Sequence, residues 1–122
     1  MSLQFNHINL VVGDPEAAAD FYIKYLTPEA QKVWLGDSLH VRGVGLMDLA
    51  FQKGTSASAP GGHHGFLASS RKVVDDLVSR LEGNGLTITE LCNESDFRSV
   101  KFLDLDGYEI EVYWEADEFI AG

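Results

Sequence analysis

The chain has 122 residues, 45% of them hydrophobic, and its 9 basic and 19 acidic side chains give a formal net charge of −10. This length predicts one domain, residues 1–122, with a single substantial core. The charge argues against a nucleic-acid-binding protein, because binding phosphates requires a basic surface, and no apolar run approaches the length of a membrane span. Cys92 is the only cysteine, so no internal disulfide can form and we expect a cytoplasmic protein.

The first half of the chain predicts one strand, one helix and three further strands. Apolar residues alternate from Phe5 to Val12, which indicates a strand. Asp14 and Pro15 are typical of a helix start, and the helical spacing of apolar residues continues to about Leu26. Three extended segments follow, at Lys32–Leu35, Leu39–Val44 and Leu46–Gln52.

The second half repeats this order after a linker. Residues 53–62 (KGTSASAPGG) are small or polar and have no periodicity, which is typical of a linker. A strand is predicted at His63–Ala68, and then a helix that begins at Ser69 or Ser70. The last three strands are expected at Leu86–Leu91, Arg98–Leu103 and Tyr108–Trp114. Each half therefore follows the order β-α-β-β-β.

This repeat predicts an α+β fold made of two tandem βαβββ modules, residues 5–52 and residues 63–114. Matching the apolar faces of the two halves aligns His7 with His63 and Asp48 with Glu111. If a helix covers one face of each four-stranded sheet, these four side chains lie on the opposite faces. We expect the two modules, placed edge to edge, to form a cup-shaped, partly open eight-stranded barrel with the helices outside.

Two histidines, a glutamate and an aspartate are a plausible ligand set for a divalent metal. Neutral imidazole and carboxylate suit iron, manganese, nickel or zinc, and the absence of thiolates argues against a structural zinc site. Two histidines with one carboxylate leave coordination positions open, as Lewis-acid catalysis or dioxygen chemistry requires. The residues alone leave the choice between His63 and His64 open, although strand alternation places His64 on the helix-facing side.

Three stretches of the chain carry a resemblance to a known family: HINLVVGDPEAAADFYIKYL (7–26), HHGFLASS (63–70) and RSVKFLDLDGYEIEVYW (98–114). They resemble the vicinal oxygen chelate superfamily, which includes glyoxalase I, fosfomycin-resistance thiol transferases, extradiol dioxygenases and bleomycin-resistance proteins. The resemblance implies that His7, His63 and Glu111 bind one divalent metal ion. Glyoxalase I takes a fourth ligand, usually glutamate, from the end of the first module, where this chain has the shorter Asp48.

Further site residues follow from their place on the same predicted faces. Glu111 and Asp48 are candidates for a general base, and Tyr113 is a candidate for a phenolic acid. Asn9 and Gln52, on the same predicted face, are candidates for binding substrate, and the charge of Arg98 makes it a candidate for binding an anionic substrate. His40 and Arg42 share a face and are expected to be exposed or to lie at the rim.

The resemblance implies a metal-dependent enzyme that acts on a small oxygen-bearing molecule, either as a lyase or isomerase or as a ring-cleaving dioxygenase. It also implies a homodimer. The alternative is a metal-free protein that sequesters a drug, as bleomycin-resistance proteins do. The net charge of −10 suits the capture of a cationic glycopeptide.

Overall fold

The computed structural model describes residues 2–43, 45, 47–56 and 61–116. The chain divides into two compact units, Met1–Ala57 and Ser58–Gly122, and the division falls within the predicted linker. Residues 57–60 of that linker lie outside the described residues, as do Val44 and Leu46 of two predicted strands.

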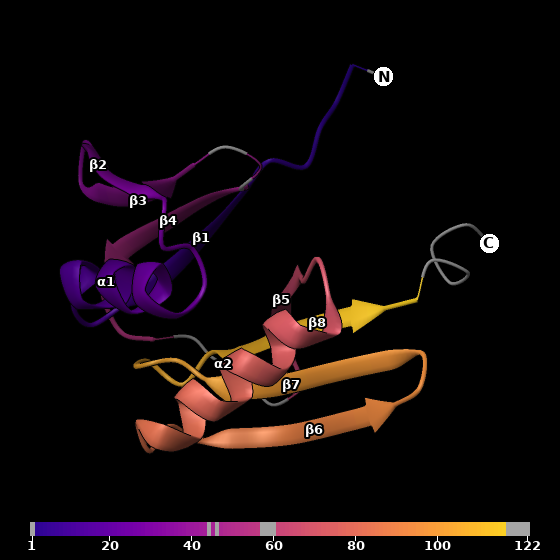
Figure 1. Ribbon diagram of the computed structural model, residues 1–122. Coiled ribbons are helices and arrows are strands. Elements are labelled where there is room, and N and C mark those ends of the chain that lie inside the picture. The colour runs from indigo at the N-terminus through magenta and orange to yellow at the C-terminus, as the bar shows by residue number, and fades with distance from the viewer. Residues whose placement is uncertain (1, 44, 46, 57–60, 117–122) are drawn as a thin grey trace. The chain divides into compact units, whose positions relative to one another are not determined.

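The first unit is a four-stranded sheet with one helix (Figure 1). Its elements are β1 (His7–Val12), α1 (Pro15–Tyr25), β2 (Gln31–Leu35), β3 (Ser38–Arg42) and β4 (Asp48–Lys53). The strand order is β1-β4-β3-β2, with β1 parallel to β4 and the other neighbours antiparallel. The helix begins as the sequence predicts, because the Asp14 carboxylate accepts a hydrogen bond from the Ala17 amide at 3.2 Å and Pro15 occupies the first turn.

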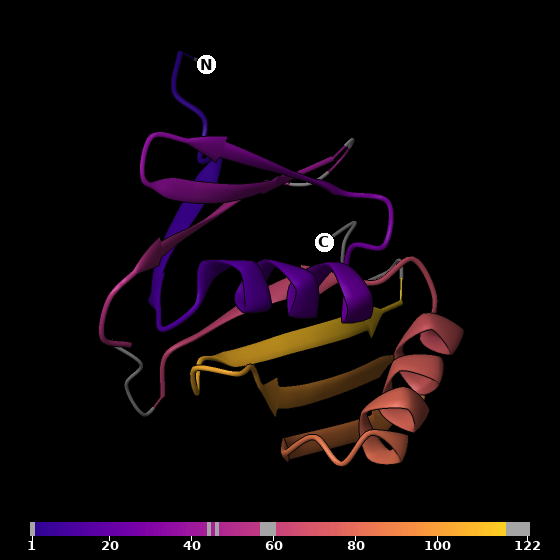
Figure 2. The same cartoon turned by 90° about the vertical axis from the view of Figure 1, so that its left-hand side faces the viewer.

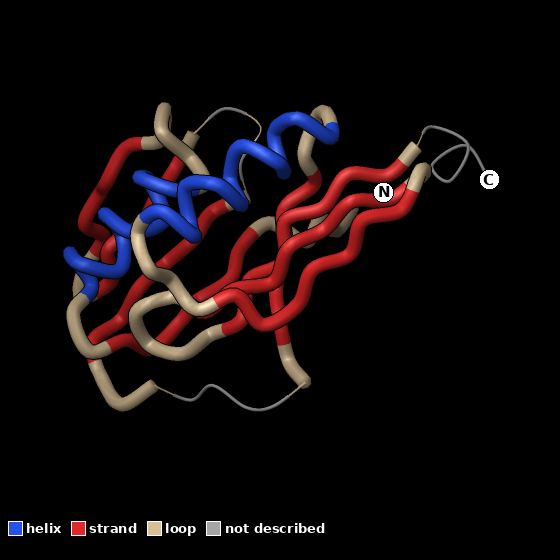
Figure 3. Tube along the Cα trace, turned by 60° about the horizontal axis from the view of Figure 1, so that its bottom comes forward, coloured by secondary structure: helices blue, strands red, loops and turns tan. Residues whose placement is uncertain are grey.

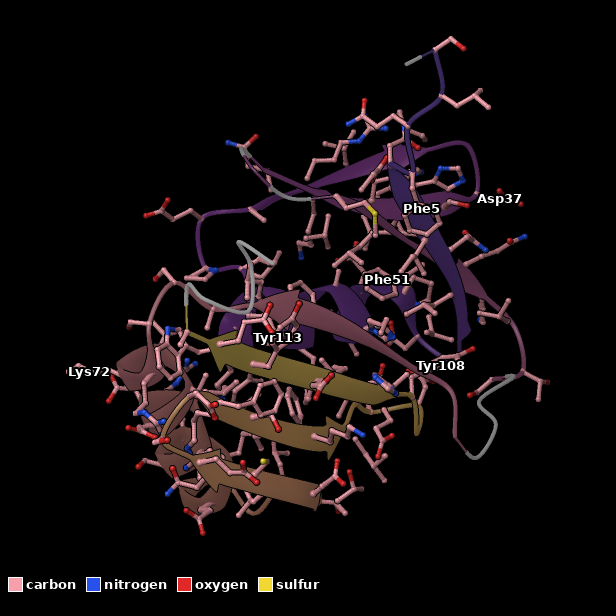
Figure 4. The ribbon with its side chains drawn as sticks, turned by 90° about the vertical axis from the view of Figure 1, so that its right-hand side faces the viewer. Phe5, Asp37, Phe51, Lys72, Tyr108 and Tyr113 are labelled. Atoms are coloured by element: carbon pink, nitrogen blue, oxygen red, sulfur yellow. The ribbon has the colours of Figure 1, made fainter. Side chains whose placement is uncertain are left out.

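The core of the first unit lies between α1 and its sheet. Phe51 on β4, labelled in Figure 4, is fully buried. Tyr22 on α1 is also fully buried, and the ring centroids of the two residues are 5.1 Å apart. Leu39, Val41 and Val12 are also fully buried in this unit. The alternation of buried and accessible residues along β3 matches the period of two that places one face of a strand against a helix.

The second unit repeats the same topology. Its elements are β5 (His63–Leu67), α2 (Arg71–Gly83), β6 (Ile88–Glu94), β7 (Phe97–Leu103) and β8 (Glu109–Glu115). The strand order is β5-β8-β7-β6, with β5 parallel to β8. Figure 2 shows α2 packed against one face of this sheet, where it contacts β7 and β8. Val74, Leu81, Val100, Phe102 and Ile110 are fully buried there.

The turn before β8 is held by the side chain of Asp104. Its Oδ1 atom accepts hydrogen bonds from the amides of Asp106 and Tyr108, both at 2.9 Å. Gly107 has a φ of 86°, a conformation that glycine adopts without steric cost. This Asp-Gly turn starts β8 in the register that places Glu109, Glu111 and Tyr113 on one face.

The predicted α+β class and the two βαβββ modules are confirmed. In the described part of the chain, eight strands form two four-stranded sheets, and each helix contacts strands of its own sheet. Figure 3 colours the strands red and the helices blue. Within the described part of the chain, no helix is both long enough and apolar enough to cross a membrane.

Candidate functional site

The face of each sheet opposite its helix, here called the helix-free face, carries almost every residue that the sequence singles out. In the first unit, strand register places on this face His7, Asn9, His40, Arg42, Asp48 and Gln52. In the second unit it places there His63, Gly65, Glu90, Lys101, Glu109, Glu111 and Tyr113.

His63 and Glu111 lie together on the helix-free face of the second unit. The Nε2 atom of His63 is 3.5 Å from Oε1 of Glu111, and the two side chains are 35% and 20% exposed. Gly65, which pairs with Glu111 in the β5–β8 ladder, has no side chain to separate them. A Cβ atom at Gly65 would lie only 3.1 Å from the Glu111 carbonyl oxygen.

His64 points to the other side of β5. It is more buried than His63, and this burial lowers the pKa of its imidazole, while the nearby charge of Asp104 acts in the opposite direction. Strand alternation therefore separates the two neighbouring histidines, and His63 is the one beside Glu111.

The other charged groups near Glu111 have partners of their own. Lys101, which pairs with Glu111 in the β7–β8 ladder, holds Oε2 of Glu90 at 2.8 Å. Its pKa is raised by that hydrogen bond, and the charges of Glu111 and Glu109 add to the effect. Glu109 accepts a hydrogen bond from the Thr89 hydroxyl at 2.6 Å. Among the carboxylates of Glu90, Glu109 and Glu111, it is therefore Glu111 that faces an imidazole, that of His63.

Tyr113 follows Glu111 on the same face of β8. Figure 4 labels Tyr113. Its ring is stacked on Phe97, with ring centroids 6.0 Å apart and planes inclined by 25°. This packing fixes the direction of the phenol ring and makes it a rigid wall of the helix-free face.

In the first unit, His7 is anchored through one ring nitrogen. Its Nδ1 atom is 2.8 Å from Oδ1 of Asn6, so Nδ1 carries the proton when it donates this bond, and Nε2 then offers a lone pair. Asn9, two residues further along β1, donates a hydrogen bond of 3.5 Å to the Gln52 side chain. The two predicted substrate-binding amides therefore form a pair.

Asp48 lies beside His7 in the β1–β4 ladder, and its carboxylate is held by two cations or potential cations. Nδ1 of His40 is 3.0 Å from Oδ1 and 3.1 Å from Oδ2, and Arg42 donates to Oδ2 from Nη2 at 2.9 Å and from Nε at 3.2 Å. Burial raises the pKa of Asp48, but the hydrogen bonds from Arg42 and His40 outweigh it and the net shift is downward.

His40 and Arg42 are the partners of Asp48, which the sequence reasoning missed. Arg42 is exposed, as expected, whereas His40 is partly buried. The signal was present in the chain, because His40 and Arg42 alternate on β3 and β3 pairs antiparallel with β4, next to Asp48. Recognising it required the register of the β3–β4 hairpin, and the short connection between the strands did not reveal that register.

Arg98 lies on the opposite side of its sheet from Glu111. Its Nε atom is 2.9 Å from Oδ1 of Asp75 on α2, its Nη1 donates to the Cys92 carbonyl at 3.3 Å, and its side chain is only 11% exposed. The structure therefore uses Arg98 to join β7 to the helix.

The expected alignment of Asp48 with Glu111 is wrong. His7 pairs with Asp48 in the first ladder, and His63 pairs with Glu109 in the second. When the histidines are superposed, Asp48 corresponds to Glu109, and Glu111 corresponds to the position two residues after Asp48. A shift of two residues keeps every side chain on its face, so apolar patterning could not detect it.

The donors fit a divalent metal in kind, since imidazole nitrogen and carboxylate oxygen suit manganese, iron, nickel and zinc. Among the residues described, no three His, Cys, Asp or Glu side chains form a group that could hold a metal ion. His7 lies in the first unit, and His63 and Glu111 lie in the second. The fold and the site therefore define a protein of two βαβββ modules that carry histidine and carboxylate donors on their helix-free faces.

Comparison with known proteins identifies the family. The family model described as "Glyoxalase/Bleomycin resistance protein/Dioxygenase superfamily" matches residues 4–112, and the chain belongs to this superfamily. No protein with curated annotation is significantly similar to it in sequence.

Solved structures with the same fold include enzymes of several kinds. The chain is similar to the genomically encoded fosfomycin resistance protein FosX from Listeria monocytogenes, with 21% identity, a TM-score of 0.79, and coverage of 97% of this chain and 98% of that one. The oxidase ChaP-H2 is 24% identical, with a TM-score of 0.77 and coverage of 94% of this chain and 95% of that one. A possible glyoxalase from Bacillus cereus is 25% identical, with a TM-score of 0.75 and coverage of 91% of this chain and 98% of that one. The E126Q variant of the Listeria FosX is known in complex with Mn(II) and 1S,2S-dihydroxypropylphosphonic acid.

Proposed function

We propose that this protein is a divalent-metal-dependent enzyme that acts on a small substrate with neighbouring oxygen atoms. The observation that carries the proposal is the pair formed by His63 and Glu111, whose Nε2 and Oε1 atoms are 3.5 Å apart on the helix-free face. An imidazole and a carboxylate at this separation need only a small adjustment to share one cation. Membership of the superfamily, and the Mn(II) bound by one FosX structure, support the same reading.

The metal donors in this proposal are His7, His63 and Glu111. His7 contributes Nε2, because its Nδ1 atom is engaged by Asn6. Asp48 is not included, because both of its oxygens already accept hydrogen bonds. A metal held by these three donors would polarise substrate oxygens and stabilise negative charge that develops on them.

The remaining residues would bind and orient the substrate. The Asn9–Gln52 amide pair offers hydrogen-bond donors and acceptors on the face that carries His7. The Tyr113 hydroxyl is a proton donor on the face that carries Glu111, and its ring direction is set by Phe97. These groups suit either a lyase or isomerase or a ring-cleaving dioxygenase, for which two histidines and one carboxylate are the ligands of ferrous iron.

Metal binding is the first test. We expect the purified protein to bind Mn(II) in isothermal titration calorimetry, and Glu111→Gln to weaken this binding at least tenfold. Glu109→Gln is the matched control, because Glu109 lies on the same strand and face but is held by Thr89. Equal affinity in the two variants would show that Glu111 is not a ligand.

Turnover is the second test. We would assay the protein with Mn(II), Ni(II), Zn(II) or Fe(II) on three probes: the hemithioacetal of methylglyoxal and glutathione, fosfomycin with water or a thiol, and catechol with dioxygen. Conversion of one probe that depends on Glu111 assigns the reaction class. Absence of metal binding together with tight binding of bleomycin would instead establish the drug-sequestering alternative.

The homodimer and the cytoplasmic location expected from the sequence remain predictions. Sedimentation velocity of the full chain tests the first, with one species of twice the chain mass of 13.4 kDa as the expected result.

A further inference from the structure

His40 occupies a position that the proposed metal site does not use. It lies on β3, and its Nδ1 atom contacts both oxygens of Asp48 at 3.0 and 3.1 Å. Both side chains are partly buried, with 16% of His40 and 21% of Asp48 exposed. A partly buried histidine bound to a carboxylate through one ring nitrogen is the arrangement that orients an imidazole for proton transfer.

Arg42 makes this arrangement rigid. Its Nε and Nη2 atoms both donate to Oδ2 of Asp48, which holds the carboxylate in one orientation. The carboxylate accepts hydrogen bonds and cannot donate while it is ionised, so the Nδ1 atom of His40 must carry the proton that it shares with Asp48. In the neutral imidazole, the Nε2 atom of His40 is then left with a lone pair.

The position of His40 places this lone pair on the same face as a proposed metal donor. Asp48 pairs with His7 on one side, and its strand is flanked by β1 and β3. Strands in a sheet are about 4.8 Å apart, so His7 and His40 stand on strands about 10 Å apart. Both imidazoles project from the same face, on strands that flank β4, so a substrate bound over β4 lies between them.

We propose that His40 is the proton acceptor of this site and that Asp48 positions it instead of binding the metal. The proposal rests on the proposed function, which supplies a bound substrate. Nε2 of His40 forms an N–H bond as a substrate C–H or O–H bond breaks, and the electron pair of that bond stays on the substrate. The imidazolium that results is stabilised by the Asp48 carboxylate, and its proton returns to the product.

The network makes a specific prediction for Asp48→Asn. Arg42 offers two donors to the Oδ2 position, so the amide oxygen of the new side chain should take that position and its NH₂ group should face His40. Two donors cannot face each other, so Nδ1 of His40 would have to become the acceptor and the proton would move to Nε2. Adding Arg42→Ala removes the constraint, lets the amide rotate and should restore the original tautomer.

Side-chain nitrogen NMR tests this without substrate or metal. The chain has four histidines, so the His40 signals can be assigned by their loss in His40→Gln. We expect the Nδ1–H tautomer in the parent, the Nε2–H tautomer in Asp48→Asn, and the Nδ1–H tautomer again in the double variant. The Nε2–H tautomer in the parent would overturn the proposal, because Nε2 could not then accept a proton.

Metal binding and turnover separate this proposal from the proposed function. Mn(II) affinity should be the same in the parent, His40→Gln and Asp48→Asn, and a tenfold loss in Asp48→Asn would identify Asp48 as a ligand and overturn the proposal. On the probe that the parent converts, His40→Gln should lower kcat by about a hundredfold or more. Asp48→Asn should lower kcat by a similar factor, and the double variant should recover part of the lost kcat.

A parent that binds no Mn(II) would contradict the proposed function and leave the tautomer result intact. Parent-like kcat in a folded His40→Gln, checked by circular dichroism, would show that another residue accepts the proton.

Discussion

Gly65 shows how one missing side chain shapes the candidate site. It pairs with Glu111, and a Cβ atom added to it would lie 3.1 Å from the Glu111 carbonyl oxygen and 3.7 Å from the Glu111 Cβ atom. We expect Gly65→Ala to destabilise the fold by about 1 kcal/mol, because the strain of overpacking exceeds the gain from a less flexible unfolded chain. It should also weaken Mn(II) binding, since the two strands must separate beside His63. Urea unfolding and calorimetry measure the two effects.

Gly83→Ala is the matched control for this substitution. Gly83 is the last residue of α2, and no atom lies within 4 Å of an added Cβ. Alanine is the better helix former, so this variant should gain up to about 1 kcal/mol. Equal changes in the free energy of unfolding of the two variants would show that the contact with Glu111 does not cause the loss of stability in Gly65→Ala.

The ion pairs of Asp48 should make stability depend on pH in a defined direction. The folded state lowers the pKa of Asp48 below its ordinary value of 3.8, so the folded protein favours the ionised form. The resulting stabilisation is fully present above the unfolded pKa and disappears as the pH falls through the folded pKa. Urea unfolding should therefore show Asp48→Asn less stable than the parent at pH 7, with the difference shrinking below about pH 4.

Asp37 provides the control for this pH series. It is exposed in the turn between β2 and β3 (Figure 4). The free energy of unfolding of Asp37→Asn should stay close to that of the parent at every pH of the series. A constant deficit for Asp48→Asn at every pH would mean that lost packing, and not lost charge, causes its effect.

At the scale of single residues, the sequence predicted faces better than partners. Alternation assigned His63 and Glu111 to one face, and the structure places them 3.5 Å apart. Alternation could not distinguish registers that differ by two residues, so it paired Asp48 with the wrong counterpart. It also said nothing of His40 and Arg42, because their role depends on a hairpin register.

At the scale of elements, α2 is joined to its sheet by a polar contact as well as by its apolar stripe. Arg98 binds Asp75 at 2.9 Å and is nearly buried. We expect Arg98→Gln to destabilise the fold by about 1–2 kcal/mol, because a charged hydrogen bond is lost and Asp75 is partly accessible to water. Mn(II) affinity should not change, since Arg98 faces away from Glu111. Thermal unfolding and calorimetry measure both quantities.

Lys72→Gln is the control for Arg98→Gln on the same helix. It breaks the Lys72–Asp76 pair, both members of which are well exposed, so its effect should be smaller. If Arg98→Gln kept its stability but lost affinity for a converted probe, Arg98 would be the substrate-binding residue that the sequence suggested.

The sequence predicted the ends of elements correctly where a capping residue marks them. Asp14 with Pro15, and Ser70, start the two helices as expected. The sixth strand begins at Ile88 instead of Leu86, because the Leu86 amide still donates to the Leu81 carbonyl at the end of α2. Such helix-terminal bonds leave little trace in hydrophobic periodicity, so the start of this strand could not be predicted from the apolar pattern.

At the scale of the whole molecule, the repeat was the most predictable feature, because each half carries its own helix start, apolar stripe and strand alternation. The proposed donors are divided between the units, with His7 in the first and His63 and Glu111 in the second. A metal bound by all three should therefore stabilise both units. With Mn(II) at a hundred times its dissociation constant, the gain is about 2.7 kcal/mol.

The two tryptophans report on this division, because Trp34 lies in the first unit and Trp114 in the second. Trp114→Phe leaves only the first fluorophore and Trp34→Phe only the second. In both variants we expect Mn(II) to raise the midpoint of urea unfolding followed by fluorescence, and adding His7→Ala should remove the rise in both. A shift confined to the Trp114 signal would place the metal on the second unit alone, because a ligand stabilises only the structure whose folded form binds it.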